Sequence, residues 1–382
     1  MKKIAKLSLV AAVAVAGLST ANAKPLEEAI KNVDVSGTVV YRYDDRTQEN
    51  QTGTGFSNGT HNSYKIAVNL KSKVNDDLTA NTRTVIGSGN GMATLDTGSG
   101  ADGEAGFALS QVNFAYTGFA NTTIIAGKQA VPSPFAVQAD GAGGEDTGAG
   151  ITAVMNAGPV TVAATYLNQT NLLTTSQDLA GLGVMGNVGP VALDAWYLDI
   201  AENGAATKGH QAYTLGAKAK VAMVSLYARH SVISHDATGA DDEKLTKIGA
   251  KANFGVIGAG IDYGFTNDVT STTTGMGITS DADADAKVNF QGWGLNLNKK
   301  DDASLLKLNI NGAVSKAIKL SANYNIYEID SVSNADAKEY YGQLTHKMGK
   351  NFMYYVRIGQ VDVDNNQDDK GTRGRLHVQY SF

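Results

Sequence analysis

Apolar and polar residues alternate along most of the chain from residue 33 onward. In residues 33–43 the odd positions hold mainly Val and Tyr, and the even positions hold mainly Asp, Ser, Thr and Arg. The same scheme returns in residues 63–71, 318–326, 352–358 and 376–382. A period of two puts successive side chains on opposite faces of a β-strand. The pattern therefore predicts a chain built from many amphipathic strands.

The connectors between these segments come in two lengths, which alternate along the chain. Short connectors lie at residues 75–77, 118–121, 158–159, 189–190 and 348–350, and long ones at residues 44–62, 88–106, 130–149, 231–243, 266–288 and 361–372. An antiparallel meander with all its long loops at one rim produces this alternation, which is the layout of an outer-membrane barrel. A soluble β-sandwich or propeller is the alternative. Lys and Arg recur at the positions of the polar strand face, and Tyr recurs at the positions of the apolar face. This distribution favours a barrel with an aromatic girdle.

The number of strands follows less directly, because nineteen segments alternate. A bacterial barrel made of one chain has an even number of strands, with both ends on the periplasmic side. Counting back from Phe382, the order of short and long connectors fails within residues 266–303. We therefore assign residues 289–297 to a long external loop, in which they form a hairpin. The prediction is an all-β, transmembrane, antiparallel up-and-down barrel of 18 strands, with 16 as the alternative.

The N-terminus has the pattern of an export signal. Three Lys in the first six residues precede the apolar stretch 7–18, and Ala21-Asn22-Ala23 supplies a cleavage site. We expect residues 1–23 to be removed and residues 24–382 to form one barrel in the outer membrane of a Gram-negative bacterium. A short helix or plug segment is expected at residues 24–32, before the first strand.

The composition excludes several classes of function. The chain has no Cys, which excludes disulfides, thiolate nucleophiles and Cys-based metal sites. Its formal net charge is −5, and −8 once the three Lys of the leader are removed, so nucleic acid is not an expected partner. No stretch after the leader approaches the roughly 18 apolar residues of a membrane-spanning helix. No Ser–His pair stands out as a hydrolase site, so we expect no enzyme activity.

The last strand ends in an aromatic residue. Tyr380 and Phe382 share the apolar parity of residues 376–382, and a C-terminal Phe on an alternating strand is typical of bacterial outer-membrane barrels. Such a strand can pair through its main chain with the barrel-assembly machinery, while its aromatic side chains anchor it. We therefore predict that Tyr380 and Phe382 form an assembly signal.

Residues 25–44 resemble the mature N-terminus of the Campylobacter-type major outer membrane proteins, a porin family, and the terminal strand fits the same family. Ile125–Gln129, running into Pro132–Phe135, resembles the approach to a porin third loop. The resemblance implies a homotrimeric, cation-preferring general porin with an inward-folded third loop. It also implies calcium as a candidate bound ion, with no other cofactor, and outer-membrane lipid, ions and small hydrophilic solutes as partners.

A barrel of 16–18 strands encloses an aqueous channel, whose selectivity depends on the charges at its narrowest point. By parity the predicted basic lining consists of Arg42, Lys65, Lys71, Arg83, Lys319, Arg357 and Arg375, with Lys128 added although both parities of its segment contain apolar residues. Residues 130–149 are the candidate constriction loop and carry Asp140, Glu145 and Asp146. If the loop folds inward, these carboxylates face the basic wall and a transverse field crosses the pore. The alternative is a solvated outer loop.

Asp140 and Asp146 are also the candidate calcium ligands. Together these features predict a general diffusion porin that passes ions and small hydrophilic solutes and prefers cations. The alternative function is a surface adhesin or structural barrel that acts through its long polar external loops.

Overall fold

The computed structural model describes residues 33–48, 59–89, 91–95, 105–172, 177–202, 209–236, 239, 241–269, 286–330, 336–364 and 369–382. The expected export signal and the expected helix or plug segment at residues 24–32 lie outside these residues. No helix in the described part of the chain is long and apolar enough to cross a membrane.

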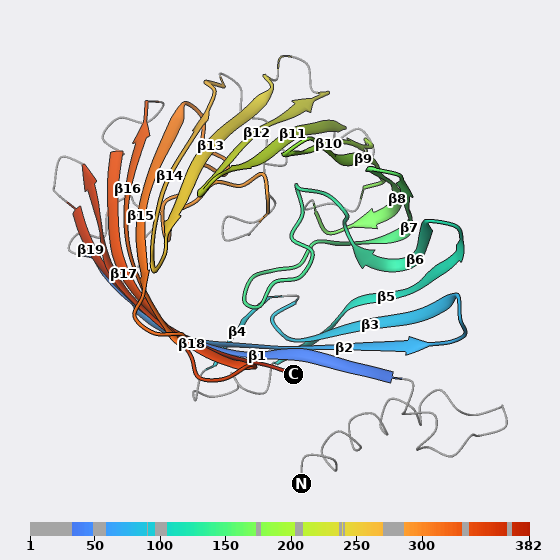
Figure 1. Cartoon of the computed structure of the whole chain (residues 1–382), viewed down its shortest axis with the longest axis horizontal. Coiled ribbons are helices and arrows are strands. Elements are labelled where there is room, and N and C mark those ends of the chain that lie inside the picture. The colour runs from blue at the N-terminus through green and yellow to red at the C-terminus, as the bar shows by residue number, and fades with distance from the viewer. Residues whose placement is uncertain are drawn as a thin grey trace, which may run out of the picture.

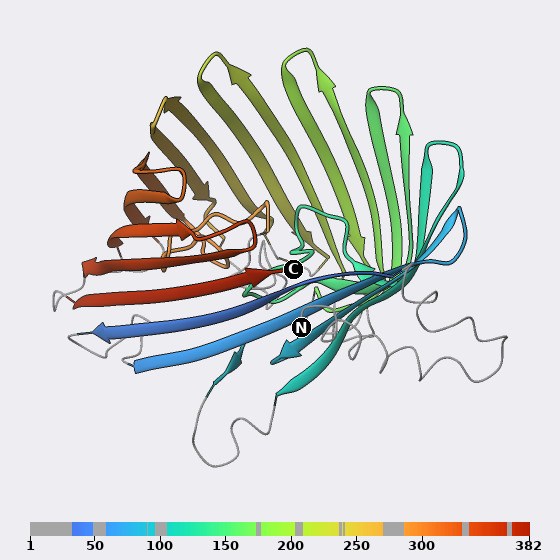
Figure 2. The same cartoon turned by 60° about the horizontal axis from the view of Figure 1, so that its bottom comes forward.

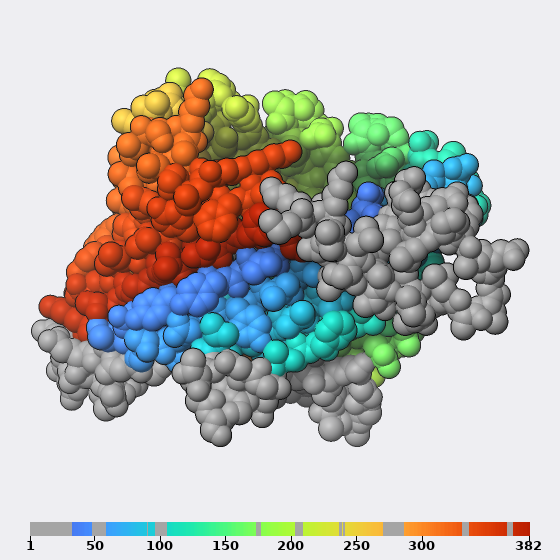
Figure 3. All heavy atoms as spheres, turned by 90° about the horizontal axis from the view of Figure 1, so that it is seen from below, coloured from blue at the N-terminus to red at the C-terminus, as the bar shows by residue number. Residues whose placement is uncertain are grey.

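The chain forms one antiparallel sheet of nineteen strands that closes on itself (Figure 1). β1 (Val33–Gln48) pairs with β2 (Gly59–Lys73) on one side and with β19 (Asp369–Ser381) on the other. Figure 3 shows the first and last strands side by side on the outer surface. The strands between them are β3 (Leu78–Gly87), β4 (Ala93–Thr94), β5 (Gly106–Phe119), β6 (Thr122–Ala130), β7 (Thr147–Ala157), β8 (Val160–Thr170), β9 (Leu179–Val188), β10 (Val191–Ile200), β11 (His210–Val221), β12 (Val224–His235), β13 (Glu243–Phe254), β14 (Ile257–Thr266), β15 (Ala303–Ala313), β16 (Ile318–Ile329), β17 (Asp336–Lys347) and β18 (Phe352–Asp364).

Eighteen of these strands build the barrel wall. β4 has two residues, pairs with β2 at Ser63 and Tyr64, and belongs to the connection between β3 and β5. The other strands each pair with their neighbours in sequence order around the barrel. The prediction of an 18-stranded closed barrel is therefore confirmed, and the 16-strand count and the soluble sandwich or propeller are not.

Tight turns and long connections occupy opposite rims of the barrel (Figure 2). In the turns between β7 and β8, β9 and β10, and β13 and β14, Gly158, Gly189 and Gly255 have φ angles of +62°, +57° and +70°. Glycine adopts this left-handed conformation without a Cβ clash.

Two of the predicted long loops, 44–62 and 361–372, are shorter than expected. β18 and β19 continue their pairing to Val363 and Asp369, and β1 extends to Gln48. Strand ends that rise above the lipid have water on both faces, so the alternation fades while the backbone ladder continues.

Residues 289–297 form no strand of the wall. Gln291 and Asn296 make an isolated bridge, Gly292 N–H donates to Leu295 O at 2.7 Å, and Leu297 N–H donates to Phe290 O at 3.0 Å. The interpretation as a hairpin within a loop is thus confirmed, but its expected external position is wrong. Phe290, Leu295 and Leu297 are buried inside the barrel. Three large apolar side chains in so short a segment are unfavourable in a solvated outer loop, which explains the inward position.

The outer face of the barrel carries the exposed apolar side chains. On β5, for example, Phe107 and Phe114 are 72% and 52% exposed. Exposed aromatic residues lie toward both rims: Tyr197, Tyr213, Tyr263, Phe265 and Tyr340 toward the long connections, and Tyr116, Phe119, Phe254, Phe352 and Tyr380 toward the tight turns. This apolar belt with two aromatic girdles is what a lipid-embedded barrel requires.

A second apolar cluster lies inside the barrel. It joins the connection 131–146, after β6, to the hairpin region 286–298, before β15, and to the inner face of the wall from β8 to β18. Its members include Val131, Phe135, Val288, Phe290, Leu297, Leu198, Ile233, Leu245 and Leu305. Val288 N–H also donates to Pro134 O at 3.2 Å, so the two inward segments contact each other directly. The lumen is therefore filled along this side, and open space remains along β1, β2, β18 and β19.

Candidate functional site

Strand parity identifies which side chains face the lumen. In β1, Val39 is 39% exposed on the outer face while Val40 is fully buried, so Arg42 and Asp44 point inward with Val40. The same argument places most of the predicted lining on the inner face: Arg42, Lys65, Lys71, Arg83, Lys319, Arg357 and Arg375. Lys71 and Lys319 lie exposed near the tight-turn rim, away from the other five.

Lys128 is placed on the outer face and not in the lumen. Its register partner on β5 is Val112, which is exposed among the outer apolar residues, whereas the adjacent Gln129 is buried. The Lys128 Nζ donates to the backbone oxygen of Leu109 at 2.7 Å. The parity of this segment was ambiguous because apolar residues occupy both of its faces.

Glu145 fastens the connection 131–146 to the inner wall. Its carboxylate accepts hydrogen bonds from Arg83 Nε at 2.8 Å, Arg83 Nη2 at 2.5 Å and Ser110 Oγ at 2.7 Å. Lys65 Nζ lies 3.0 Å from the same carboxylate and also donates to the backbone oxygens of Asp140 and Gly143. The side chains of Lys65 and Glu145 are both fully buried. These groups therefore act as an anchor within the protein: Glu145 borders the cavity described below, but its carboxylate is closed off from solvent by Lys65, Arg83 and Ser110.

The ionisation of Glu145 follows from these contacts. Burial by itself raises the pKa of the Glu145 carboxyl, but the hydrogen bonds from Arg83 and Ser110 and the charges of Lys65 and Arg83 outweigh it. The net result is a pKa below the ordinary value for Glu. The carboxylate is thus charged at neutral pH, and the expected field between Glu145 and the basic residues is quenched by direct contact.

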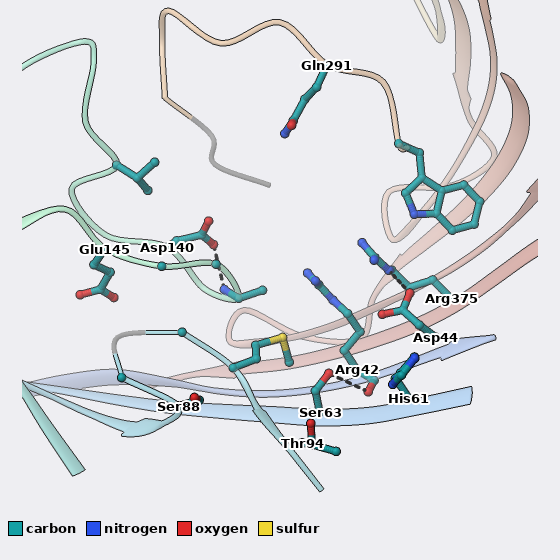
Figure 4. A pocket seen from close by; sticks show the side chains of 18 of the residues that line it. Arg42, Asp44, His61, Ser63, Ser88, Thr94, Asp140, Glu145, Gln291 and Arg375 are labelled. Carbon is teal, nitrogen blue, oxygen red and sulfur yellow. Dashed lines mark hydrogen bonds and ion pairs between the residues drawn. The ribbon is translucent and has the colours of Figure 1, made fainter. Parts of the chain in front are cut away.

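Asp146 and Asp140 have different surroundings. The Asp146 carboxylate accepts the backbone N–H of Val137 at 2.7 Å, which holds the two arms of the connection together. Among the described residues, the Asp140 carboxylate accepts only the nearby N–H of Ala142, at 2.8 Å, and it lines the open cavity (Figure 4). Within the described residues no group of three or more His, Asp or Glu side chains is arranged to hold a metal ion.

A cavity of about 1030 Å³ lies between the connection 131–146, residues 291–293 of the hairpin 290–297, and the wall formed by β1, β2, β18 and β19. Arg42 and Arg375 point into it from the wall, opposite Asp140, as Figure 4 shows. Arg375 is paired with Asp44, with Nε to Oδ1 at 2.6 Å. Arg357 completes this row of three arginines on adjacent strands. The predicted basic wall and acidic loop residue Asp140 are therefore brought together across a real opening.

The hairpin at 290–297 forms another side of this cavity, and sequence reasoning did not assign it a role. Glu339 on β17 holds the hairpin tip, because its carboxylate accepts the N–H groups of Trp293 at 2.8 Å and Gly294 at 2.6 Å. Asn325 also donates to Glu339 at 2.7 Å. Trp293 then lies 5.1 Å from the Arg357 guanidinium carbon. A Trp between two glycines, Gly292 and Gly294, was the available signal for such a hairpin.

The family model described as Campylobacter major outer membrane protein matches residues 1–373, almost the whole chain. This chain belongs to that family. The resemblance carried by residues 25–44 is thereby confirmed. No curated protein matches the chain.

Solved structures with the same fold include Pseudomonas aeruginosa OpdQ (14% identity, TM-score 0.69, 92% of this chain and 99% of that one). Pseudomonas aeruginosa OccK8 (OprE) has 11% identity and a TM-score of 0.68 over 93% of this chain and 99% of that one. Acinetobacter baumannii OccAB3 has 13% identity and a TM-score of 0.67 over 92% of this chain and all of that one. At these identities the similarity shows the fold. The family and the closed barrel together indicate that this chain is located in the bacterial outer membrane and has the architecture of a porin.

The rim of long connections of this family member is acidic. The described parts of these connections, apart from 131–146, carry Asp178, Glu202, Asp236, Asp241, Asp242, Asp268, Asp301, Asp302 and Asp330, against Lys287, Lys299 and Lys300. Partial burial and the neighbouring carboxylates of Asp330, Asp268 and Asp301 raise the pKa of Asp302. The excess of carboxylates over lysines in these described residues gives this mouth of the barrel a negative charge.

Proposed function

We propose that the protein is a general diffusion porin, which passes ions and small hydrophilic solutes through its lumen without chemical change. The observation that carries this proposal is the cavity of about 1030 Å³, lined mainly by charged and polar residues, within a closed barrel of an outer-membrane family. An aqueous channel is the general property of barrels of this strand number.

We further propose that the channel prefers cations, as the family resemblance implied. The acidic rim supports this preference, because a mouth with excess negative charge raises the local concentration of cations. The arginine row on the inner wall acts in the opposite sense. The net preference is therefore assigned to the rim and to Asp140, and not to Glu145.

The proposal is tested by the reversal potential of the refolded protein in a planar bilayer under a KCl gradient. We expect stepwise openings and a cation-selective reversal potential. The double variant Asp301→Asn/Asp302→Asn should move the reversal potential toward zero, most strongly at low salt, where the Debye length exceeds about 10 Å.

The matched control is Asp76→Asn/Asp77→Asn at a tight turn of the opposite rim. It removes the same formal charge, but Asp76 is already paired with Lys73 at 2.8 Å, so a smaller shift is expected. Equal shifts in the two double variants would contradict the assignment of selectivity to the rim of long connections. A folded barrel with no conductance would overturn the porin proposal and favour an adhesive or structural role.

We also propose a homotrimer embedded in outer-membrane lipid. Lys128 supports a protein contact at β6, because a charged Lys on the lipid face is unfavourable, by an amount that rises with depth to about 2–4 kcal/mol at the bilayer midplane. Lys128→Glu would then weaken the oligomer seen by light scattering in detergent, whereas Lys319→Glu on the inner face would not. An unchanged oligomer in both variants would argue against a subunit contact at β6.

Export by a cleaved signal and recognition of Tyr380 and Phe382 by the assembly machinery are part of the same proposal. In the folded barrel Phe382 is already paired with Gly37, with N···O distances of 2.9 and 3.0 Å. The assembly machinery would therefore recognise the C-terminal signal before β1 pairs with β19. Truncation of Phe382 should reduce the amount of protein inserted in the outer membrane, and mass spectrometry of the inserted protein should find Lys24 at its N-terminus.

Calcium binding remains a proposal restricted to Asp140. The Asp146 carboxylate is engaged by Val137 N–H, and calcium needs six to eight oxygen ligands. Terbium luminescence, excited through nearby aromatic rings and displaced by calcium, tests the site. An Asp140→Asn variant with unaltered luminescence would exclude Asp140 as a ligand.

A further inference from the structure

Three arginines that line the cavity, Arg42, Arg46 and Arg357, have no carboxylate partner among the described residues. Arg42 makes no ion pair there, and its Nε is buried without a hydrogen-bond partner. Arg357 donates from Nε to Gln343 Oε1 at 2.8 Å and has no carboxylate within 4.0 Å in the same part of the chain. By contrast, Arg83, Arg229 and Arg375 each contact an Asp or Glu.

The strand register gathers these charges at one place. Arg357 on β18 lies opposite Arg375 on β19, and Arg375 lies opposite Asp44 on β1, two residues from Arg42. Asp44 is the one carboxylate in direct contact with this row in the described structure. With Arg46, which also lines the cavity, four guanidinium groups stand against the carboxylates of Asp44 and Asp140. The remaining excess of positive charge can be neutralised by an anion from solution.

Aromatic rings hold one of these guanidinium groups in a fixed orientation. The Arg357 guanidinium carbon lies 4.9 Å from the centroid of Tyr341, 5.1 Å from Trp293 and 5.4 Å from Tyr355. Such contacts stabilise the cation and restrict its rotation. Its Nε is used by Gln343, while its terminal N–H groups form the planar fork that matches the two oxygens of a carboxylate.

We propose that Arg42 and Arg357 form a solute-binding site in the lumen that binds small organic carboxylates, with the rings of Trp293 and Tyr355 beside the apolar part of the ligand. A carboxylate is favoured over a multiply charged phosphate because the excess charge is small and aromatic surface lies directly beside the guanidinium groups. The site depends on the proposed pore only for access by solutes, since binding itself needs no conduction.

The first test uses the fluorescence of the complete protein in detergent. The chain has two Trp, so Trp196→Phe leaves Trp293 as the sole indole. Benzoate should change the Trp293 emission in a saturable way, and neutral benzamide, which has the same ring, should not. In the same background, Arg42→Gln and Arg357→Gln should each weaken benzoate binding at least about tenfold, the effect of losing a charge-assisted hydrogen bond.

Lys319→Gln is the matched control, because it removes one lumen charge near the tight-turn rim, away from the cavity lining. It should leave benzoate binding unchanged. Arg357→Lys keeps the charge but loses the planar fork, so it should bind benzoate more weakly than the parent protein. Equal responses to benzoate and benzamide, unchanged binding in both Gln variants, or an equal loss in Lys319→Gln would each overturn the site.

The second test separates this proposal from the porin proposal. Benzoate added to a conducting channel should produce brief current interruptions that disappear in Arg357→Gln. Benzoate binding in detergent without any conductance in bilayers would overturn the porin function and leave the binding site in place. Conductance without benzoate binding in either assay would overturn the binding site alone.

Discussion

Substitution of Glu145 by Gln tests whether the connection 131–146 is held in the lumen by charge pairing. Gln has nearly the same shape, but its amide nitrogen would face a donor, either Arg83 or Lys65, where an oxygen now accepts. Both cations would remain in place without a counter-ion, and Lys65 is fully buried. Breaking a buried pair by removing one partner costs about 3–5 kcal/mol.

That cost is large enough to change the population of the docked connection. At about 1.36 kcal/mol per factor of ten, the docked state loses roughly 10² to 10⁴ in its equilibrium constant. We expect the connection to leave the wall for part of the time. Single-channel recordings of Glu145→Gln should then show a higher mean conductance and increased current noise.

Asp140→Asn is the control for this prediction. It changes one carboxylate of the same connection, which accepts only the N–H of Ala142 in the part of the chain that the structure describes. It should alter ion selectivity and leave the noise at the parent level. Conductance and noise in Glu145→Gln equal to those of the parent would refute the reasoning, since they would mean that apolar packing alone holds the connection.

The same anchor predicts a dependence on pH. The pKa of Glu145 is lowered in the folded protein, so its contribution is fully present above the unfolded value of about 4.3 and is lost as the pH falls through the folded value. Channel noise should therefore be constant near neutral pH and rise only in acid, as the pH falls below the ordinary Glu value and through the lowered value of the folded protein. The rise should be absent in Glu145→Gln, which has no group to protonate.

Three further substitutions probe other parts of the structure. Glu339→Gln should release the hairpin tip and shift the emission of Trp293, measured in the Trp196→Phe background; an unshifted emission would show that other contacts hold the tip. Leu297→Ala should weaken the inner apolar cluster by about 2–5 kcal/mol, seen as a lower temperature of hairpin release in the same assay, while the barrel stays folded. Gly127→Ala should lower the refolding yield, since φ at this position is +120° and an added Cβ would collide with the backbone of β5.

The wall of the barrel was predictable because its signal is local. Each strand must show apolar groups to lipid and polar groups to water, so period-two alternation fixes both the strands and their facing. Val39 and Val40 show the limit of that signal, since both are apolar while one faces out and the other in. Lys128 was placed on the wrong face for the same reason.

The interior was less predictable because it depends on contacts between distant segments. Residues 289–297 alternate like a strand, yet their apolar side chains pack against the connection 131–146 inside the barrel. Glu145 was correctly associated with the basic wall, but sequence alone could not distinguish charges that face each other across water from charges in contact. The two cases differ by a few ångströms in the distance between the Glu145 carboxylate and the cations of Arg83 and Lys65. Because these groups are in contact, Glu145 is an anchor and not the selectivity residue that was predicted.

Two opposed zones of charge therefore lie in series along this lumen, an acidic rim and an arginine row, and salt should separate their effects. Charges on the exposed rim act through water and are screened within about 10 Å at 0.1 M salt. Carboxylate binding at Arg42 and Arg357 depends on direct hydrogen bonds in a partly enclosed site, where screening is weaker. Raising the KCl concentration should thus reduce the cation preference before it abolishes benzoate binding. If both effects declined together with salt, the arginine row would be acting only through its long-range field, and the proposed contact site would have to be abandoned.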